Sequence, residues 1–290
     1  MEQYFIHLGI LVGIYLLLAQ SFNLNFGLGR SFNLAHIAVY AVGAYVTALL
    51  STELGATFWI CILASMILSG LFALLIGVIS IKLQSDYFAI GTLAFSSVVT
   101  ALLINWKSLT RGVLGIPGIP RPDIGRIDFY QNENFILLIG VFVMLVQTLL
   151  YVIFRSPYAR GLRAQAEFEQ GAKALAWSPR QLRNFSFILS SALAGLAGSF
   201  FAYYINYIDP SSFSLSEMVF VLTIVVVGRP GSFWGCLGAA AFLVLLPEPL
   251  RFIEMSPSVL GPLRQMLYAL ILFAVVFVNR ARLFPVERRV

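Results

Sequence analysis

One polar segment holds acidic, basic and small residues at spacings that favour docking on another surface. It reads RGLRAQAEFEQGAKALAWSPRQLRNF over residues 160–185 and carries Glu167 and Glu169 among arginines and a lysine. The stretch Leu162–Trp177 is rich in helix formers, and Pro179 ends it, so we predict a short helix here. Such a helix can bind in a groove of another protein or lie among lipid head groups. Its apolar stripe, at three- and four-residue steps, consists of Phe168, Ala172, Leu175 and Ala176.

A second set of polar side chains lies within or beside apolar stretches and could meet a small solute. Tyr87, Thr92 and Ser96 recur at helical spacing and offer hydroxyls to amino acid or amide groups. Hydrogen bonding between neighbouring helices is the alternative role for such hydroxyls in lipid. Asn33 and His36 precede them in the chain. Because a single histidine offers no partner chemistry, a hydrogen-bonded packing role is favoured for His36 over a pathway role.

The run Gly228-Arg229-Pro230-Gly231-Ser232 interrupts a long apolar stretch. Pro-Gly is typical of turns, so one interpretation is a plain turn between two short membrane spans. The other is a broken helix whose exposed backbone lines a conduit, because irregular backbone at membrane depth must be covered by protein or water. The sequence leaves both open, and Gly228 and Gly231 are the candidate pathway residues.

The motifs of catalysis and of metal or nucleotide binding are missing from this sequence. None of the three lysines follows a glycine, so the lysine of a P-loop is absent, and neither H-E-x-x-H nor G-x-S-x-G occurs. We therefore predict a chain that is not an enzyme, with no catalytic residue, no metal site and no cofactor of its own. Every carboxylate lies at the end of an apolar stretch or in a loop, which removes the usual machinery of ion-coupled carriers.

The composition indicates that the solvent of this chain is mostly lipid. Of its 290 residues, 59% are hydrophobic and only 11% are charged, and the mean hydropathy is +0.88. A soluble domain carries about 25% charged residues, so a soluble enzyme and a disordered chain are both excluded. The net charge of +6 comes from basic residues that flank apolar stretches, which favours membrane orientation over nucleic-acid binding.

The positions of the charges divide the chain into apolar stretches that predict an all-α polytopic membrane protein. Since about 20 apolar residues cross a bilayer, six stretches are long enough, and the last three are short or interrupted. We expect about eight to ten transmembrane helices, some of them short or broken, in a single domain over residues 1–290. The charge-free stretches are 3–29, 31–52, 54–81, 87–106, 134–154, 184–208, 218–228, 230–247 and 265–279.

The basic residues also predict an orientation in the membrane. If each stretch crosses once and the C-terminus is inside, the inside loops hold most of the basic residues, as the positive-inside rule requires. The N-terminus and the Pro- and Gly-rich loop 107–133 then lie outside, and the segment 155–183 lies inside. The inside residues are Arg30, Lys82, Arg155, Arg160, Arg163, Lys173, Arg180, Arg183, Arg229, Arg280, Arg282, Arg288 and Arg289.

Small residues form a further pattern in the stretch 184–208. Ala194 and Gly198 are four positions apart, and so are Ser191 and Gly195 on the adjacent face. Such pairs allow two helices to approach closely. They suit either an interface with a partner subunit or tight packing inside this chain.

Several motifs in order resemble one family of transporters. The segment EFEQGAKALAWS (167–178) resembles the EAA-type loop of ABC importer permeases, and specifically that of the branched-chain amino acid permease family. The YFAI block and the Gly/Pro loop GVLGIPGIP resemble the LivM-type subunit more than its LivH-type partner. The remaining blocks that resemble the family are 28–50, 83–99, 192–214 and 225–251.

The resemblance implies a type II ABC importer-like fold and a permease subunit in the bacterial inner membrane. Such a subunit forms the pathway for branched-chain or other neutral amino acids, or for urea and amides, delivered by a periplasmic binding protein. It pairs with a dissimilar, LivH-type permease and with two ATP-binding subunits that hold ATP and Mg. The N-terminus is then periplasmic and the C-terminus cytoplasmic. A stand-alone secondary carrier or channel for small polar solutes is the alternative.

The same resemblance assigns coupling to the ATP-binding subunits to residues 163–176. This chain departs from the family pattern in three places: the family usually has glycine at Ala176 and at Arg229, and an acidic residue at Lys173. We expect Ala176 to restrict the turn after the docking helix, because alanine resists positive φ. The candidate coupling residues are Arg163, Glu167, Glu169, Ala172, Lys173, Leu175 and Ala176.

Overall fold

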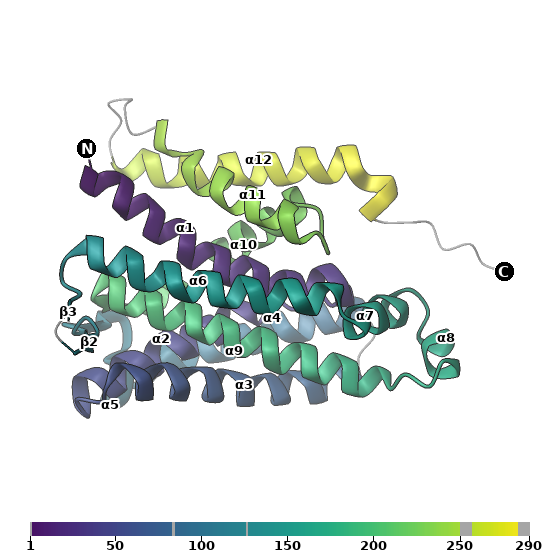
Figure 1. The fold of residues 1–290 in the computed structure, drawn as a ribbon, viewed down its shortest axis with the longest axis horizontal. Helices are drawn as coiled ribbons and strands as arrows, with labels where there is room; N and C mark the ends of the chain where they lie inside the picture. Colours follow the sequence, from purple (N-terminus) through teal and green to yellow (C-terminus); the bar gives the residue numbers. More distant parts are fainter. Residues whose placement is uncertain (1, 83–84, 126, 250–256, 284–290) are drawn as a thin grey trace.

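Helices make up almost all of the computed structural model, which describes residues 2–82, 85–125, 127–249 and 257–283 (Figure 1). The all-α class predicted from the sequence is confirmed. The helices are α1 (Glu2–Phe22), the π-helix η1 (Asn23–Leu28), α2 (His36–Glu53), α3 (Phe58–Lys82), α4 (Ser85–Asn105), α5 (Lys107–Thr110), η2 (Gly112–Leu114), α6 (Asn132–Arg155), α7 (Pro157–Glu167), α8 (Glu169–Ala174), α9 (Pro179–Ile205), η3 (Pro210–Phe213), α10 (Leu215–Val227), α11 (Phe233–Leu245) and α12 (Pro257–Leu283).

Each predicted apolar stretch coincides with a helix. Within the described residues, six helical segments are long and apolar enough to cross a membrane, namely 2–28, 58–77, 87–105, 132–155, 179–205 and 259–278. The helix α2 has 18 residues, and the last two stretches before α12 form the short helices α10 and α11, of 13 residues each. Several helices extend past the charge-free stretches: α9 begins at Pro179 and includes Arg180 and Arg183, α10 begins at Leu215 and includes Glu217, and α12 begins at Pro257 and includes Arg264.

The centre of the molecule is α9, which packs against α2 and α3 through small residues. A Cβ atom on Gly43 would lie 2.4 Å from the Cα of Gly195, and one on Gly198 would lie 2.3 Å from the carbonyl oxygen of Tyr40. Ser65 Oγ donates to the carbonyl oxygens of Gly43 (3.1 Å) and Gly195 (2.9 Å). The small-residue pattern of this stretch therefore serves close packing inside the chain.

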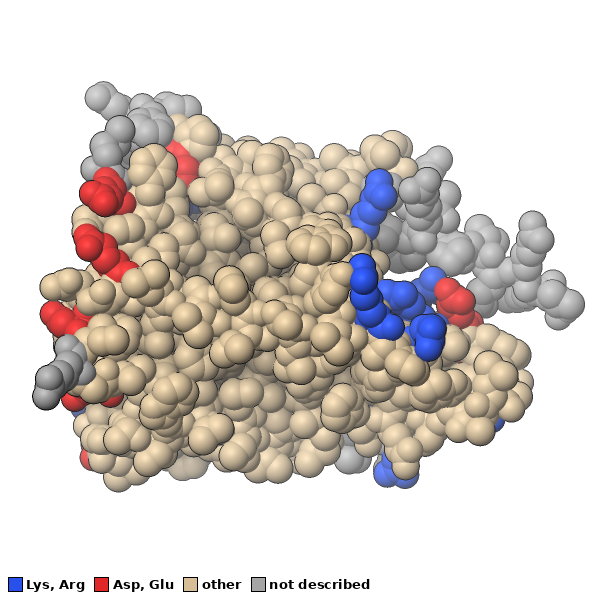
Figure 2. Space-filling view, in the orientation of Figure 1, with Lys and Arg blue, Asp and Glu red and all other residues tan. Residues whose placement is uncertain are grey.

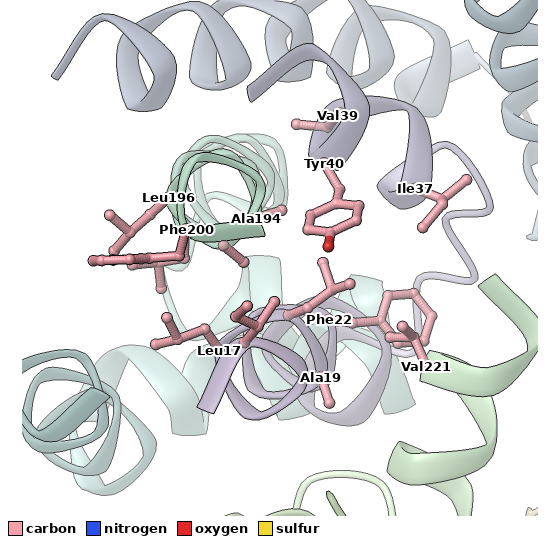
Figure 3. Close-up of a cluster of buried hydrophobic side chains, with 14 of the residues drawn as sticks. Leu17, Ala19, Phe22, Ile37, Val39, Tyr40, Ala194, Leu196, Phe200 and Val221 are labelled. Carbon is pink, nitrogen blue, oxygen red and sulfur yellow. The ribbon is translucent and has the colours of Figure 1, made fainter. Parts of the chain in front are cut away.

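A layer of large side chains joins α1 to this centre (Figure 3). Leu17 and Phe22 of α1 lie opposite Phe200 of α9 and Tyr40 of α2, and Val221 of α10 closes one side. Phe22, Phe200 and Leu17 are fully buried. Because helices in lipid gain little from leaving water, this interdigitation is what holds α1 and α10 to the bundle.

The outer surface carries a band without charges (Figure 2). Acidic residues gather at the end of the molecule that holds the start of α1 and the β2–β3 turn, and basic residues gather at the end that holds α7 (Figures 1 and 2). This is the surface of a multi-pass membrane protein. Large exposed apolar side chains of the band include Trp59, Leu63, Ile67 and Leu71 of α3, Leu137, Val141, Met144 and Leu145 of α6, and Met266, Leu270, Phe273 and Phe277 of α12.

The loop 107–133 is more regular than the sequence indicates. It contains three short strands, β1 (Ile116–Pro117), β2 (Asp123–Ile124) and β3 (Ile127–Asp128). The first pairs antiparallel with β4 (Tyr207–Ile208), and the other two pair with each other. Gly115, at φ 66°, lies so close to β4 that a Cβ would be 2.2 Å from the oxygen of Ile208. Anchoring to β4 therefore orders a segment that its Pro and Gly content alone would leave irregular.

Candidate functional site

The polar segment after α6 forms two helices, so the single helix predicted over 162–177 is wrong. Ser156 caps α7 by accepting a hydrogen bond from the amide of Ala159 (3.4 Å), and Pro157 occupies the first helical position. Phe168 then adopts an extended conformation (φ −153°, ψ 95°), which separates α7 from α8. The amide of Phe168 still bonds to the oxygen of Ala164 (2.9 Å), so the break is a sharp, hydrogen-bonded corner. The segment Pro157–Ala174 is called the α7–α8 segment below.

The turn that ends α8 depends on a strained alanine. Ala176 has φ 60°, and the amides of Ala176 and Trp177 bond to the oxygens of Lys173 and Ala172, both at 3.0 Å. This is the Schellman arrangement, in which glycine usually occupies the left-handed position. Arg229 is also left-handed (φ 65°) after α10. Alanine and arginine thus adopt positive φ at the two positions where the resemblance noted in the sequence implies glycine, each at a cost of about 1 kcal/mol.

Among the described residues, three exposed ion pairs involve the acidic residues of the α7–α8 segment. Glu169 contacts Lys173 (2.9 Å) within α8 and Arg183 (3.7 Å) of α9, and Glu167 contacts Arg30 (3.8 Å). The hydrogen bond from Lys173, together with the positive charge of Arg183, lowers the pKa of Glu169, although partial burial opposes this. Each pair is exposed and contributes at most about 1 kcal/mol. Of these pairs, Glu169–Arg183 links α8 to α9, and Glu167–Arg30 links the end of α7 to the loop before α2.

The predicted apolar stripe divides into a buried and an exposed part. Ala172 is 2% exposed, whereas Phe168 and Leu175 are 63% and 70% exposed. Figure 1 shows α8 beyond the ends of the membrane helices. Two large apolar side chains at such a place are available to another protein. Phe168 belongs to the stripe that the sequence indicates, but its exposure could not be predicted once a continuous helix was assumed.

The structure brings Arg163, a predicted coupling residue, to Gly231, a predicted pathway residue. Arg163 Nη2 donates to the oxygen of Gly231 (3.3 Å), and the amide of Gly231 donates to Asn23 Oδ1 (2.8 Å). Asn23 Nδ2 donates to the oxygen of Ser232 (3.1 Å). Gly27 lies against Gly231, where a Cβ would be 2.3 Å from its amide nitrogen. These residues, Asn23, Gly27, Arg163, Gly231 and Ser232, are called the glycine junction below.

The glycine junction depends on the π-helical turn η1 at the end of α1. Just before η1, Gln20 Nε2 in the last turn of α1 donates to the oxygen of Phe233 (2.8 Å) at the start of α11. A π-helical turn displaces the chain from the α-helical path and is frequent at functional sites. Sequence reasoning missed Gln20, Asn23 and Asn25. The polar residues in QSFNLN, inside an otherwise apolar stretch, are the signal that could have identified them.

The backbone after α10 borders an open depression. Its volume is about 430 Å³, and Gly228, Arg229, Ser232, Trp234 and Phe242 contribute to its lining. Gly228 packs against α11 so closely that a Cβ would be 2.6 Å from the Cα of Cys236. The glycine at this position allows the tight turn between the two short helices.

Two other candidate pathway residues lie in the interior beside η1. Asn33 and His36 are both fully buried. Asn33 Oδ1 accepts from the amide of Ala35 (3.0 Å), and His36 Nε2 lies 3.0 Å from Ser21 Oγ. The ring of His36 packs on Phe22, with ring centroids 5.3 Å apart. Their complete burial and these contacts favour a packing role, while Asn33 Nδ2 and His36 Nδ1 are buried without a hydrogen-bond partner.

The candidates on α4 separate into one exposed and two buried residues. Tyr87 is 65% exposed, whereas Thr92 is 1% and Ser96 is 8% exposed. Thr92 Oγ1 donates to the oxygen of Ala89 (2.9 Å) and accepts from the amide of Leu34 (3.0 Å). Thr92 therefore fixes α4 to the loop before α2, and Tyr87 alone of the three is open to a solute or a partner.

Comparisons with known proteins agree with this architecture. Residues 4–276 match the family described as branched-chain amino acid transport system / permease component. The high-affinity branched-chain amino acid transport system permease protein LivM of Escherichia coli (strain K12) is 33% identical over 282 residues, covering 89% of this chain and 66% of that protein. Its Salmonella typhimurium counterpart is 35% identical over 274 residues, covering 86% and 64%.

A more distant relative comes from an archaeon. The probable branched-chain amino acid transport permease protein LivM of Methanocaldococcus jannaschii is 29% identical over 232 residues, covering 77% of this chain and 65% of that protein. The chain spans about two thirds of the length of these curated relatives. No solved structure shows a significant match. With a family match over nearly its whole length and LivM-type relatives, this chain belongs to the branched-chain amino acid transport permease component family.

Proposed function

We propose that this chain is a transmembrane permease subunit of an ABC importer for branched-chain or other neutral amino acids. Family membership supports the class, and the names of the relatives supply the substrate. In this proposal a periplasmic binding protein delivers the solute, a dissimilar permease subunit completes the pathway, and two ATP-binding subunits hydrolyse ATP. The protein lies in the bacterial inner membrane with the α7–α8 segment in the cytoplasm and the loop 107–133 in the periplasm.

The observation that carries the proposal is the exposed pair Phe168 and Leu175 on the α7–α8 segment. An apolar pair outside the apolar band has no lipid to cover it, so a protein surface is the natural partner. The segment is linked to α9 by the Glu169–Arg183 ion pair and by the hydrogen-bonded turn at Ala176. A rigid element of this kind can transmit a displacement of the ATP-binding subunits.

The glycine junction gives that displacement a route into the membrane part. Arg163 of α7 bonds to Gly231, and Gly231 is bonded to Asn23 at the end of α1. Movement of α7 therefore acts directly on the turn between α10 and α11, as in other rigid-body transitions. In this proposal the turn shifts together with α7 during each transport cycle.

Leu175→Asp tests the docking surface. Because Leu175 is 70% exposed, the change should leave the fold intact and weaken association with the ATP-binding subunits about 30-fold, as expected when a central interface residue is lost. Co-purification of the complex and leucine uptake by cells measure the effect. Leu54→Asp, at the other end of the molecule and 73% exposed, is the matched control and should keep the ATP-binding subunits.

Two results would contradict the proposal. One is normal co-purification and normal uptake in Leu175→Asp. The other is labelling of Leu175→Cys from the periplasmic side by a membrane-impermeant maleimide, which would place the α7–α8 segment on the wrong side of the membrane.

A further inference from the structure

A cavity of about 240 Å³ lies between α1, α10, α11 and α12, away from the glycine junction. It differs from the rest of the membrane part because charged side chains from three different segments line it. Glu217 comes from α10, Glu248 follows α11, and Arg264 comes from α12. Ionisable groups within membrane segments are costly and mark functional sites.

Aromatic rings build one side of this cavity. Tyr15 of α1 and Phe220 of α10 meet edge to face, with ring centroids 5.0 Å apart, and Phe220 lies 4.4 Å from the ring of Tyr268 of α12. Leu11 and Val244 add apolar surface. Rings that pack in this way fix the relative positions of three helices, so the cavity is a formed part of the fold.

Both carboxylates have known partners, and Glu217 has unused acceptor capacity. Tyr15 Oη donates to Glu217 Oε2 (3.1 Å), and Tyr4 Oη donates to Glu248. A carboxylate offers about four acceptor sites, so one hydroxyl donor leaves Glu217 able to bind a cationic group. The rings of Tyr15 and Tyr268 restrict where that group can lie.

Arg264 supplies hydrogen-bond donors on the same cavity, complementary to the acceptors of Glu217. Its Nε and Nη2 atoms are buried, and neither has a hydrogen-bond partner. These two nitrogens form the edge of the guanidinium group that makes paired, parallel hydrogen bonds to a carboxylate. Buried donors of a charged group are almost always satisfied in folded proteins. The vacant edge of Arg264 therefore indicates a carboxylate ligand.

We propose that this cavity binds one free α-amino acid with a small apolar side chain, a conclusion that rests on the proposed function and deepens it. The carboxylate of the ligand pairs with Arg264, its ammonium group with Glu217, and its side chain contacts Leu11 and Val244. The volume lies below the range typical of drug-sized ligands, which suits a single amino acid. Urea or an amide would leave both charges unpaired, and phosphate would be repelled by two carboxylates.

Protection of an introduced cysteine tests this binding. Ser216 lines the cavity, while the natural Cys61 and Cys236 are buried, so Ser216→Cys provides a selective target for a small maleimide in membranes that contain the complete transporter. Saturating leucine, isoleucine or valine should slow labelling several-fold. Leucinamide and 4-methylpentanoate, which lack the carboxylate and the ammonium group respectively, should not. Gln265→Cys is a second reporter in the same cavity.

Variants identify the groups responsible. Adding Arg264→Gln should raise the leucine concentration needed for protection about tenfold or more, since a charge-assisted pair is lost, and Glu217→Gln should act in the same direction. Lys107→Gln removes an exposed cation in α5 and should change nothing. Equal labelling with and without leucine, both in the absence of nucleotide and with ATP and vanadate, would overturn the inference, as would unchanged protection in Arg264→Gln.

Leucine uptake by the same transporter with its binding protein separates the two proposals. If uptake is normal but no protection occurs, only the cavity assignment fails. If no branched-chain or other neutral amino acid is taken up, the proposed function itself fails.

Discussion

The two ends of the short helix α10 differ in how completely the polar groups around them are paired. At its C-terminal end, the amide and the oxygen of Gly231 and the oxygen of Ser232 all have side-chain partners. At its N-terminal end, the cavity beside Glu217 contains the buried, unpartnered Nε and Nη2 of Arg264. A fully paired group helps to hold a structure together, whereas an unpaired buried charged edge costs free energy until a ligand pairs with it. The glycine junction is therefore a structural contact, called the joint below, whereas the cavity has the features of the proposed binding site.

The largest expected effect is at the joint, in Gly27→Ala. The added Cβ would lie 2.0 Å from Asn23 Oδ1 and 2.3 Å from the amide nitrogen of Gly231. Because backbone cannot give way here, we expect a loss of about 3 kcal/mol of stability and little purified complex. Melting of the detergent-purified transporter measures it. Gly140→Ala is the control, since no atom lies within 4 Å of its Cβ position; similar melting temperatures for the two variants would refute the tight contact.

Asn23→Leu should have the next largest effect. The change keeps the approximate size but leaves the amide of Gly231 and the oxygen of Ser232 without their partner. Unsatisfied buried polar groups cost about 2 kcal/mol, so melting should fall and uptake should drop with it. Asn105→Leu, whose exposed side chain bonds only within its own helix turn among the described contacts, should melt like the unmodified protein. A stable, active Asn23→Leu transporter would mean that the joint is not structural.

The positions of charges in the sequence predict the membrane helices well, because a charge in lipid is expensive whatever the fold. The stretches between charges therefore mark every long helix, and the short lengths of α10 and α11 follow from the Gly-Arg-Pro-Gly interruption at 228–231. The orientation in the membrane and the partner subunits are not determined by the fold of this chain alone, since they depend on the bilayer and on other chains.

The contacts of the glycine junction and of the cavity could not be predicted from the sequence, because they join residues that are far apart in the chain. Asn23 and Gly231 are 208 positions apart, and only the packing of α1 beside α11 makes them neighbours. Helical periodicity cannot show this. The corner at Phe168 could not be predicted either, because the residue there is neither glycine nor proline and so gives no sign of a helix break. Arg264, which lies before the last predicted stretch, gains its meaning only when α12 packs beside Glu217.

A smaller effect of opposite sign is expected for Ala176→Gly. Glycine adopts φ 60° without the penalty that alanine suffers, so the turn after α8 should gain about 1 kcal/mol. Hydrogen exchange of the α8 amides should slow accordingly. The matched change Ala174→Gly, inside α8, should lose about 1 kcal/mol through helix propensity and exchange faster. If both variants exchange faster, the left-handed turn at Ala176 is not formed.

No loss of stability is expected for Arg264→Met, because the change removes two buried donors that have no partner, and the ligand-free protein should be at least as stable as the unmodified one. Since Nε and Nη2 have no partners to lose, an apolar side chain of similar length can occupy the same space. Arg121→Met is the contrast: Arg121 donates to the oxygens of Phe129 and Tyr130 and to Asn132 Oδ1, so its removal should lower the melting temperature clearly. A pronounced destabilisation by Arg264→Met would show that the guanidinium group already has a structural partner. The cavity would then be a structural contact like the glycine junction and not a binding site.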